Sequence, residues 1–101
     1  MAHTDSSLEF KSDPNLWAAN EAFRVGQEVE KVRRQAKLGQ RSAAESFERS
    51  AVSHDRTAKS YEKLAEFSER GAEYREHAAR HRAFAQEDRR MAQRLREMAD
   101  R

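Results

Sequence analysis

The sequence contains no cysteine, which excludes disulfide bonds and thiolate metal sites. It also has no isoleucine, and Leu, Val and Phe together number only fourteen among 101 residues. This share of large apolar side chains is below the level that usually separates globular from disordered chains. We therefore expect a small core and a chain that is only marginally stable as a monomer.

Long apolar runs are absent as well. No segment approaches the roughly 20 apolar residues that a membrane-spanning helix needs. The first residues, MAHTDSSLEF, lack the basic start and apolar stretch of a signal peptide. A cytoplasmic protein is the expectation from these features.

Alanine and charged residues are what the sequence has in abundance. There are seventeen Ala, and charged residues make up 38% of the chain. Alanine has the best helix propensity but contributes little hydrophobic energy. With one proline and three glycines, the composition predicts a single all-α domain with much helix and little core.

The helix boundaries follow from capping signals. Residues 1–12 show no periodic signal and are expected to be flexible. Asp13-Pro14 is typical of a helix start, because Asp caps free N–H groups and Pro suits the first helical position. Gly39 is a helix-stop signal, and Ser42-Ala43-Ala44-Glu45 has the pattern of a capping box. These signals predict an antiparallel helical hairpin over residues 13–101, with a helix at 14–38, a turn at 39–41 and a long helix at 42–100.

The first predicted helix has an apolar pattern of its own. Apolar residues recur at spacings of three and four, as on one face of a helix. They are Leu16, Ala19, Ala22, Phe23, Val25, Gly26, Val29, Val32 and Ala36.

The second predicted helix carries a seven-residue repeat. Residues 46–80 divide into SFERSAV, SHDRTAK, SYEKLAE, FSERGAE and YREHAAR, and each unit contains Ala. A seven-residue period is typical of coiled-coil pairing, and rings alternating with Ala favour close approach of two helices. The predicted interaction seam consists of Phe47, His54, Tyr61, Phe67, Tyr74, Phe84, Met91, Leu95 and Met98.

The apolar stripe of the long helix changes phase between Tyr61 and Phe67. One interpretation is a coiled-coil stammer within a continuous helix. The other is a break near Gly71, which would give a three-helix bundle. Little turn chemistry accompanies Gly71, so we favour the continuous helix.

Two sets of side chains are candidates for binding. His77 and His81 are four residues apart and so neighbours on one helix face, where such a pair can bind a metal ion weakly. Protonation of these histidines near pH 6 is also expected to weaken a helical assembly that buries them. Arg75, Arg82, Arg89 and Arg96 recur every seven residues and are candidates for binding an anion.

The function that the sequence favours is non-catalytic. There is no glycine-rich phosphate loop and no nucleophile-elbow pattern, so we expect no enzyme activity, no cofactor and no small-molecule substrate. The leading hypothesis is a helical interaction or scaffold protein that self-associates through the seam, as a homodimer or higher assembly, or docks another helical protein. The alternative is an anion-binding protein whose Arg-rich C-terminal helix contacts nucleic acid or an anionic membrane surface.

Overall fold

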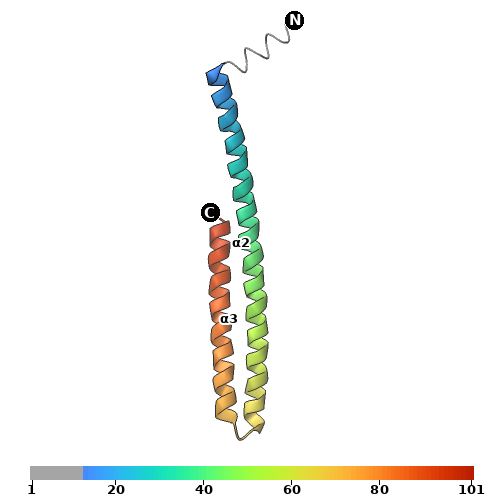
Figure 1. Cartoon of the computed structure of the whole chain (residues 1–101). Coiled ribbons are helices and arrows are strands. Elements are labelled where there is room, and N and C mark those ends of the chain that lie inside the picture. The colour runs from blue at the N-terminus through green and yellow to red at the C-terminus, as the bar shows by residue number, and fades with distance from the viewer. Residues whose placement is uncertain (1–12) are drawn as a thin grey trace. The chain divides into compact units, whose positions relative to one another are not determined.

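The computed structural model describes residues 13–101, which form two helices (Figure 1). Helix α2 spans Pro14–Phe67 and helix α3 spans Gly71–Ala99, with residues 68–70 between them. The prediction of an all-α fold is confirmed, since the described residues contain no strand. The segment 1–12, predicted to be flexible, lies outside the described residues.

The start of α2 is where the sequence predicts it. Pro14 is the first helical residue. The Asp13 carboxylate Oδ1 accepts hydrogen bonds from the backbone N–H groups of Asn15, at 2.9 Å, and Leu16, at 3.3 Å. Asp13 therefore satisfies two of the donors that the first turn of a helix leaves without a partner.

Helix α2 continues through residues 39–41, so the predicted turn at this position is wrong. Gly39 does not adopt a positive φ, and open space surrounds the place that its Cβ would take. A glycine inside a helix costs only about 1 kcal/mol relative to alanine, which a long helix can sustain. Ser42 is not a cap, because it lies within α2, where its carbonyl accepts a hydrogen bond from the Ser46 hydroxyl at 3.2 Å.

The chain reverses instead at residues 68–70, so the continuous helix predicted over 42–100 is also wrong. The alternative prediction placed a break near Gly71 correctly, but the described residues form two helices rather than three. The break accounts for the different phase of the stripe up to Tyr61 on α2 and the stripe from Tyr74 on α3, because two separate helices need not share one register. Ser68 Oγ accepts a hydrogen bond from the Arg70 backbone N–H at 3.1 Å within this connection.

Gly71 is buried at the point where α3 begins beside the end of α2. A Cβ at this position would lie 2.8 Å from the Ala65 carbonyl oxygen, closer than carbon and backbone oxygen can approach without displacement. The short connection therefore depends on the absence of a side chain at Gly71.

Alanine and one glycine make up the buried positions of the described residues. They are Ala44, Ala51, Ala58 and Ala65 on α2, and Gly71, Ala78, Ala85, Ala92 and Ala99 on α3. Members of each set are seven residues apart, so each set forms one stripe along its helix. No larger side chain is fully buried among residues 13–101. Small residues on both stripes let the two helix backbones approach closely.

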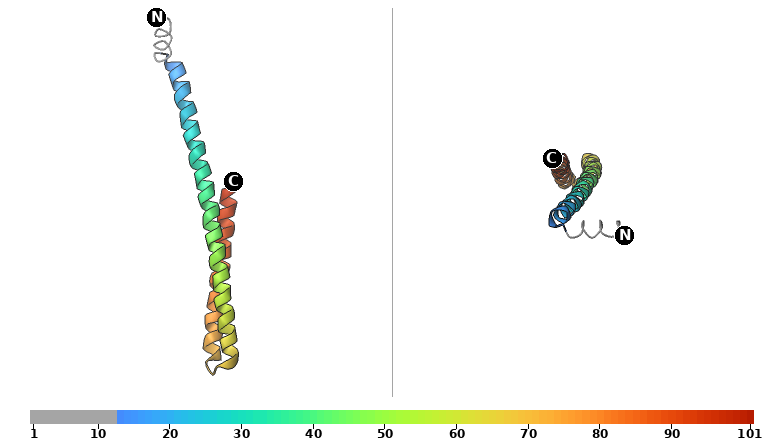
Figure 2. Two further views of the ribbon diagram at one scale, coloured as in Figure 1. Left: turned by 90° about the vertical axis from the view of Figure 1, so that its right-hand side faces the viewer. Right: turned by 90° about the horizontal axis from the view of Figure 1, so that it is seen from above.

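Residues 36–101 form one compact unit, in which α3 runs antiparallel beside α2 (Figures 1 and 2). The ring centroids of Tyr61 and Tyr74 are 6.0 Å apart, and those of His54 and His81 are 5.1 Å apart. His54 precedes Tyr61 by seven residues on α2, and His81 follows Tyr74 by seven residues on α3. The two contacts therefore repeat along the antiparallel pair with a period of seven residues. Residues 1–35 form the other unit, whose described part is the first 22 residues of α2.

The two glycines at the predicted and observed turns should respond oppositely to alanine. Gly39→Ala should raise the free energy of unfolding by about 0.5–1 kcal/mol, because it improves helix propensity in open space. Gly71→Ala should lower it, because the new methyl group meets the Ala65 carbonyl. Urea denaturation followed by circular dichroism measures both. Destabilisation by Gly39→Ala together with a neutral Gly71→Ala would contradict this description of the chain.

Candidate functional site

Aromatic rings and imidazoles form a continuous stack between α2 and α3. Tyr61 is central: its ring lies 5.1 Å from that of His77 and 5.8 Å from that of His81, centroid to centroid. His54 lies beside both His81 and Phe84, with a centroid separation of 5.3 Å to the latter. Because the alanine stripe brings the helices close, the rings of the histidines and of Tyr61 remain half-buried at the edge of the contact rather than inside it, and Phe84 is more exposed.

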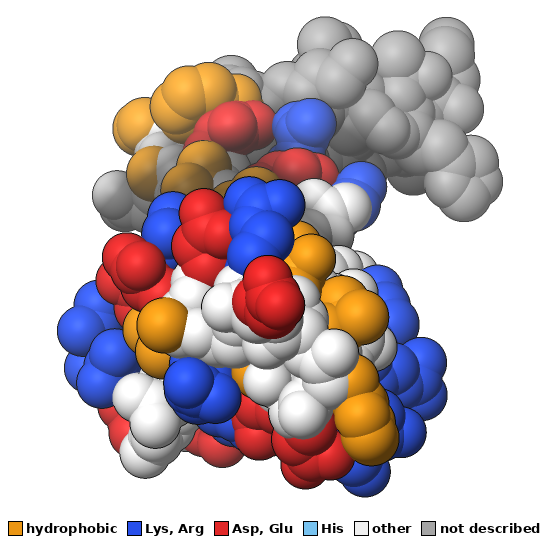
Figure 3. Space-filling model, turned by 90° about the horizontal axis from the view of Figure 1, so that it is seen from below, with side chains coloured by type: hydrophobic (Ala, Val, Ile, Leu, Met, Phe, Trp, Pro, Cys, Tyr) orange, Lys and Arg blue, Asp and Glu red, His pale blue; other side chains and the backbone are white. Residues whose placement is uncertain are grey.

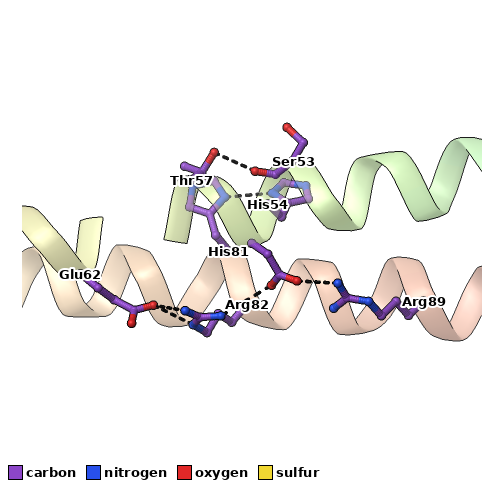
Figure 4. Close-up of polar contacts among 8 residues, drawn as sticks. Ser53, His54, Thr57, Glu62, His81, Arg82 and Arg89 are labelled. Atoms are coloured by element: carbon purple, nitrogen blue, oxygen red, sulfur yellow. Dashed lines mark hydrogen bonds and ion pairs between the residues drawn. The ribbon is translucent and has the colours of Figure 1, made fainter. Parts of the chain in front are cut away.

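His54 and His81 share a hydrogen bond between their Nδ1 atoms, which are 2.9 Å apart (Figure 4). One ring must donate its N–H and the other must accept with a neutral nitrogen. The sequence singled out His77 and His81 as the pair, but the structure directs His81 to His54 and stacks His77 on Tyr61. Within residues 13–101, no group of three or more His, Asp or Glu side chains is arranged to hold a metal ion.

Three of the four arginines that recur every seven residues on α3 contact acidic side chains on α2. Arg82 binds Glu62 through two of its nitrogens, and Arg82 also lies 3.7 Å from the Asp55 carboxylate. Arg89 donates to the same Asp55 at 2.5 Å (Figure 4). The acids Glu48, Asp55 and Glu62 are seven residues apart, as are the arginines, so the antiparallel register repeats the pairing along the edge.

Arg96 completes this edge with a bidentate contact. Its Nε and one terminal nitrogen donate to the two Glu48 carboxylate oxygens, each at 2.9 Å. These hydrogen bonds lower the pKa of Glu48 below its ordinary value and raise the pKa of Arg96. Arg82, Arg89 and Arg96 are therefore engaged with acids of the same chain, whereas Arg75 makes no ion pair among the described residues.

The predicted seam is divided between several environments. Phe47, His54, Tyr61, Tyr74 and Leu95 are half-buried along the contact between α2 and α3. Phe84, Met91 and Met98 lie seven residues apart on α3 and are 45%, 38% and 44% exposed. Phe67 is the last residue of α2, and 89% of its surface is exposed, so it lies outside the contact between α2 and α3.

Exposed large apolar side chains are most closely spaced in the first 22 residues of α2, outside the predicted seam. Exposed large side chains there are Leu16, Trp17, Phe23, Val25, Val29 and Val32. The spacing predicted that these residues lie on one face of the helix, but they do not. At 3.6 residues per turn, Phe23 lies about 160° round the helix from Val25.

One face of this segment is nevertheless continuous. We call it the valine stripe; its members are spaced alternately by four and three residues and are Ala18, Ala22, Val25, Val29 and Val32. All five are exposed, and the three valines line a shallow groove together with Glu21 and Glu28. The sequence carries this signal, since the spacing repeats every seven residues, but the repeat at 46–80 is the more regular of the two.

At the end of the molecule that carries residues 68–70, charged side chains of both signs lie around and between uncharged and hydrophobic surface (Figure 3). Among the described residues, neither helix has a stretch apolar enough to cross a lipid bilayer. Comparison with known protein families, with curated proteins and with solved structures gives no match.

The histidine pair should show strong coupling in a double-mutant cycle. His54→Phe or His81→Phe alone leaves the other imidazole without its hydrogen bond and should destabilise the protein by about 1 kcal/mol. The double variant places two phenyl rings together, so the second substitution should cost much less than the first. Urea denaturation at pH 8 gives each free energy of unfolding.

His77→Phe serves as the control for this cycle, because His77 stacks on Tyr61 without pairing to a second imidazole. Combined with His54→Phe it should be additive. Additivity of His54→Phe and His81→Phe would show that the 2.9 Å contact contributes nothing to stability.

Proposed function

We propose that the protein is a non-catalytic helical interaction module that self-associates through the valine stripe. The observation that carries this proposal is the exposure of Val25, Val29 and Val32 on one face of a helix, with no covering side chain among the described residues. Water contact with such a stripe is unfavourable, and burying it against another helix removes apolar surface at roughly 25 cal/mol per Å².

The seven-residue contacts between α2 and α3 support part of the original seam hypothesis. Rings and alanines alternate along this contact as in a coiled-coil hairpin, but the pairing is between two helices of one chain. The half-buried seam residues are thereby occupied within the chain, and we assign self-association to the valine stripe instead. A short alanine core also favours an assembly, because so small a core leaves the single chain with little stabilising burial.

Anion binding through the Arg-rich helix has less support. Three of the four candidate arginines already bond to Glu48, Asp55 or Glu62, so an anion would have to replace an intramolecular partner. Salt separates the two functions. Phosphate-dependent binding falls steeply between about 50 and 200 mM salt, whereas pairing of apolar helix faces hardly changes.

Light-scattering mass after size exclusion tests the proposal. The native chain should give at least twice its 11.7 kDa mass at both low and high salt. Val29→Glu should weaken association about tenfold or more, because a carboxylate cannot be buried in the stripe without a partner. Glutamate is a good helix former, so α2 itself should be retained.

Val52→Glu is the matched control. Val52 is also an exposed valine of α2, but it lies outside the valine stripe, so the assembly mass should not change. A native chain that remains monomeric at high concentration, or equal effects of both substitutions, would overturn the proposal.

A further inference from the structure

The two flanks of the valine stripe carry different charges. One flank holds Glu21 and Glu28, seven residues apart. The other holds Ala19, Gly26 and Arg33, also seven apart. Glu28 makes no ion pair among the described residues, while Arg33 has only an exposed contact with Glu30 at 3.3 Å. Both groups are therefore available to a neighbouring helix.

The orientation of a second helix decides which flanks meet. In an antiparallel pair of identical helices, each flank faces its own copy. The flank with Glu21 and Glu28 would then oppose another pair of glutamates, and like charges in such positions are destabilising. Arg24 pairs with Glu21 of its own helix at 3.2 Å and reduces this repulsion, but Glu28 makes no ion pair among the described residues and keeps its full charge.

A parallel pair brings unlike flanks together. When two parallel copies are aligned in register, each residue faces the same residue number of the other copy across the stripe. A residue on one flank of the first helix then lies near the residue five positions later on the opposite flank of the second helix. Glu28 of one copy then lies beside Arg33 of the other, and the two-fold symmetry forms this pair twice. The valines of the stripe face their own counterparts, and the groove lined by Val25, Val29, Val32 and Glu28 receives the second helix.

We propose that residues 18–33 pair with the same residues of a second copy of this chain, parallel and in register, with Glu28–Arg33 pairs on both sides. This deepens the proposed function and rests on it. The pairing differs from the α2–α3 contact within each chain, which is antiparallel and centred on alanine. One protein thus uses two heptad stripes on α2 for two orientations of helix pairing.

Introduced cysteines test the register directly, because the natural chain has none. Val32→Cys and Ala22→Cys each place one thiol on the stripe of the full chain. In a parallel, in-register dimer, each variant should form a covalent dimer on mild oxidation. Asn20→Cys, on the opposite face of the helix, should cross-link at least tenfold more slowly and controls for random collision.

An antiparallel dimer gives a different pattern. Neither Val32→Cys nor Ala22→Cys would cross-link alone, because each thiol would face a different residue of the partner. A dimeric native mass with this pattern overturns the parallel register while the proposed function stands. A monomeric native mass overturns both.

Charge reversal at Glu28 gives a second test. The dissociation constant of the dimer should change in opposite directions for parallel and antiparallel pairing. Glu28→Lys places like charges together in the parallel dimer and should raise its dissociation constant roughly tenfold. In an antiparallel dimer the same change relieves repulsion between glutamates and tightens association. Adding Arg33→Glu to Glu28→Lys should restore the native dissociation constant. A tighter Glu28→Lys dimer would refute the proposal.

Discussion

Close packing of alanine against alanine is the constraint on which the rest of this structure depends. The buried stripes of α2 and α3 contain nothing larger than a methyl group, so stability comes from near approach of two backbones rather than from bulky side chains. Near approach in turn requires Gly71, where a Cβ would lie 2.8 Å from the Ala65 carbonyl. It also pushes the rings of His54, Tyr61 and Tyr74 to the edge of the contact.

Groups at that edge decide the register rather than the strength of the pairing. The alanine stripe alone would fit several registers, each shifted by seven residues. The His54–His81 bond and the Glu48–Arg96 pair are satisfied together in only one of them. Two other polar side chains lower the stability of the fold. Gln40 Oε1 and Asp88 Oδ2 are buried without a hydrogen-bond partner in the described residues.

Local signals in the sequence predicted an all-α chain and its helix start at Asp13-Pro14, but not the other ends of the helices. A capping-box pattern follows Gly39 and little turn chemistry accompanies Gly71, so local signals favour a turn at Gly39, whereas the tertiary surroundings of the two glycines decide the reverse. Gly39 has open space around it, whereas Gly71 meets the Ala65 carbonyl. The arginine period was visible, but its acidic partners become apparent only once the antiparallel register is known. For that reason the arginine period on its own resembles an anion-binding surface.

The central claim, that alanine stripes hold α2 and α3 together, is tested most directly by enlarging one buried alanine. Ala85→Leu adds bulk at a fully buried position, whereas Ala83→Leu adds the same bulk at an exposed position of the same helix. Urea denaturation should show Ala85→Leu lowering the free energy of unfolding by about 1–3 kcal/mol. Ala83→Leu should change it by less than about 0.5 kcal/mol. Equal effects, or stabilisation by Ala85→Leu, would contradict the account.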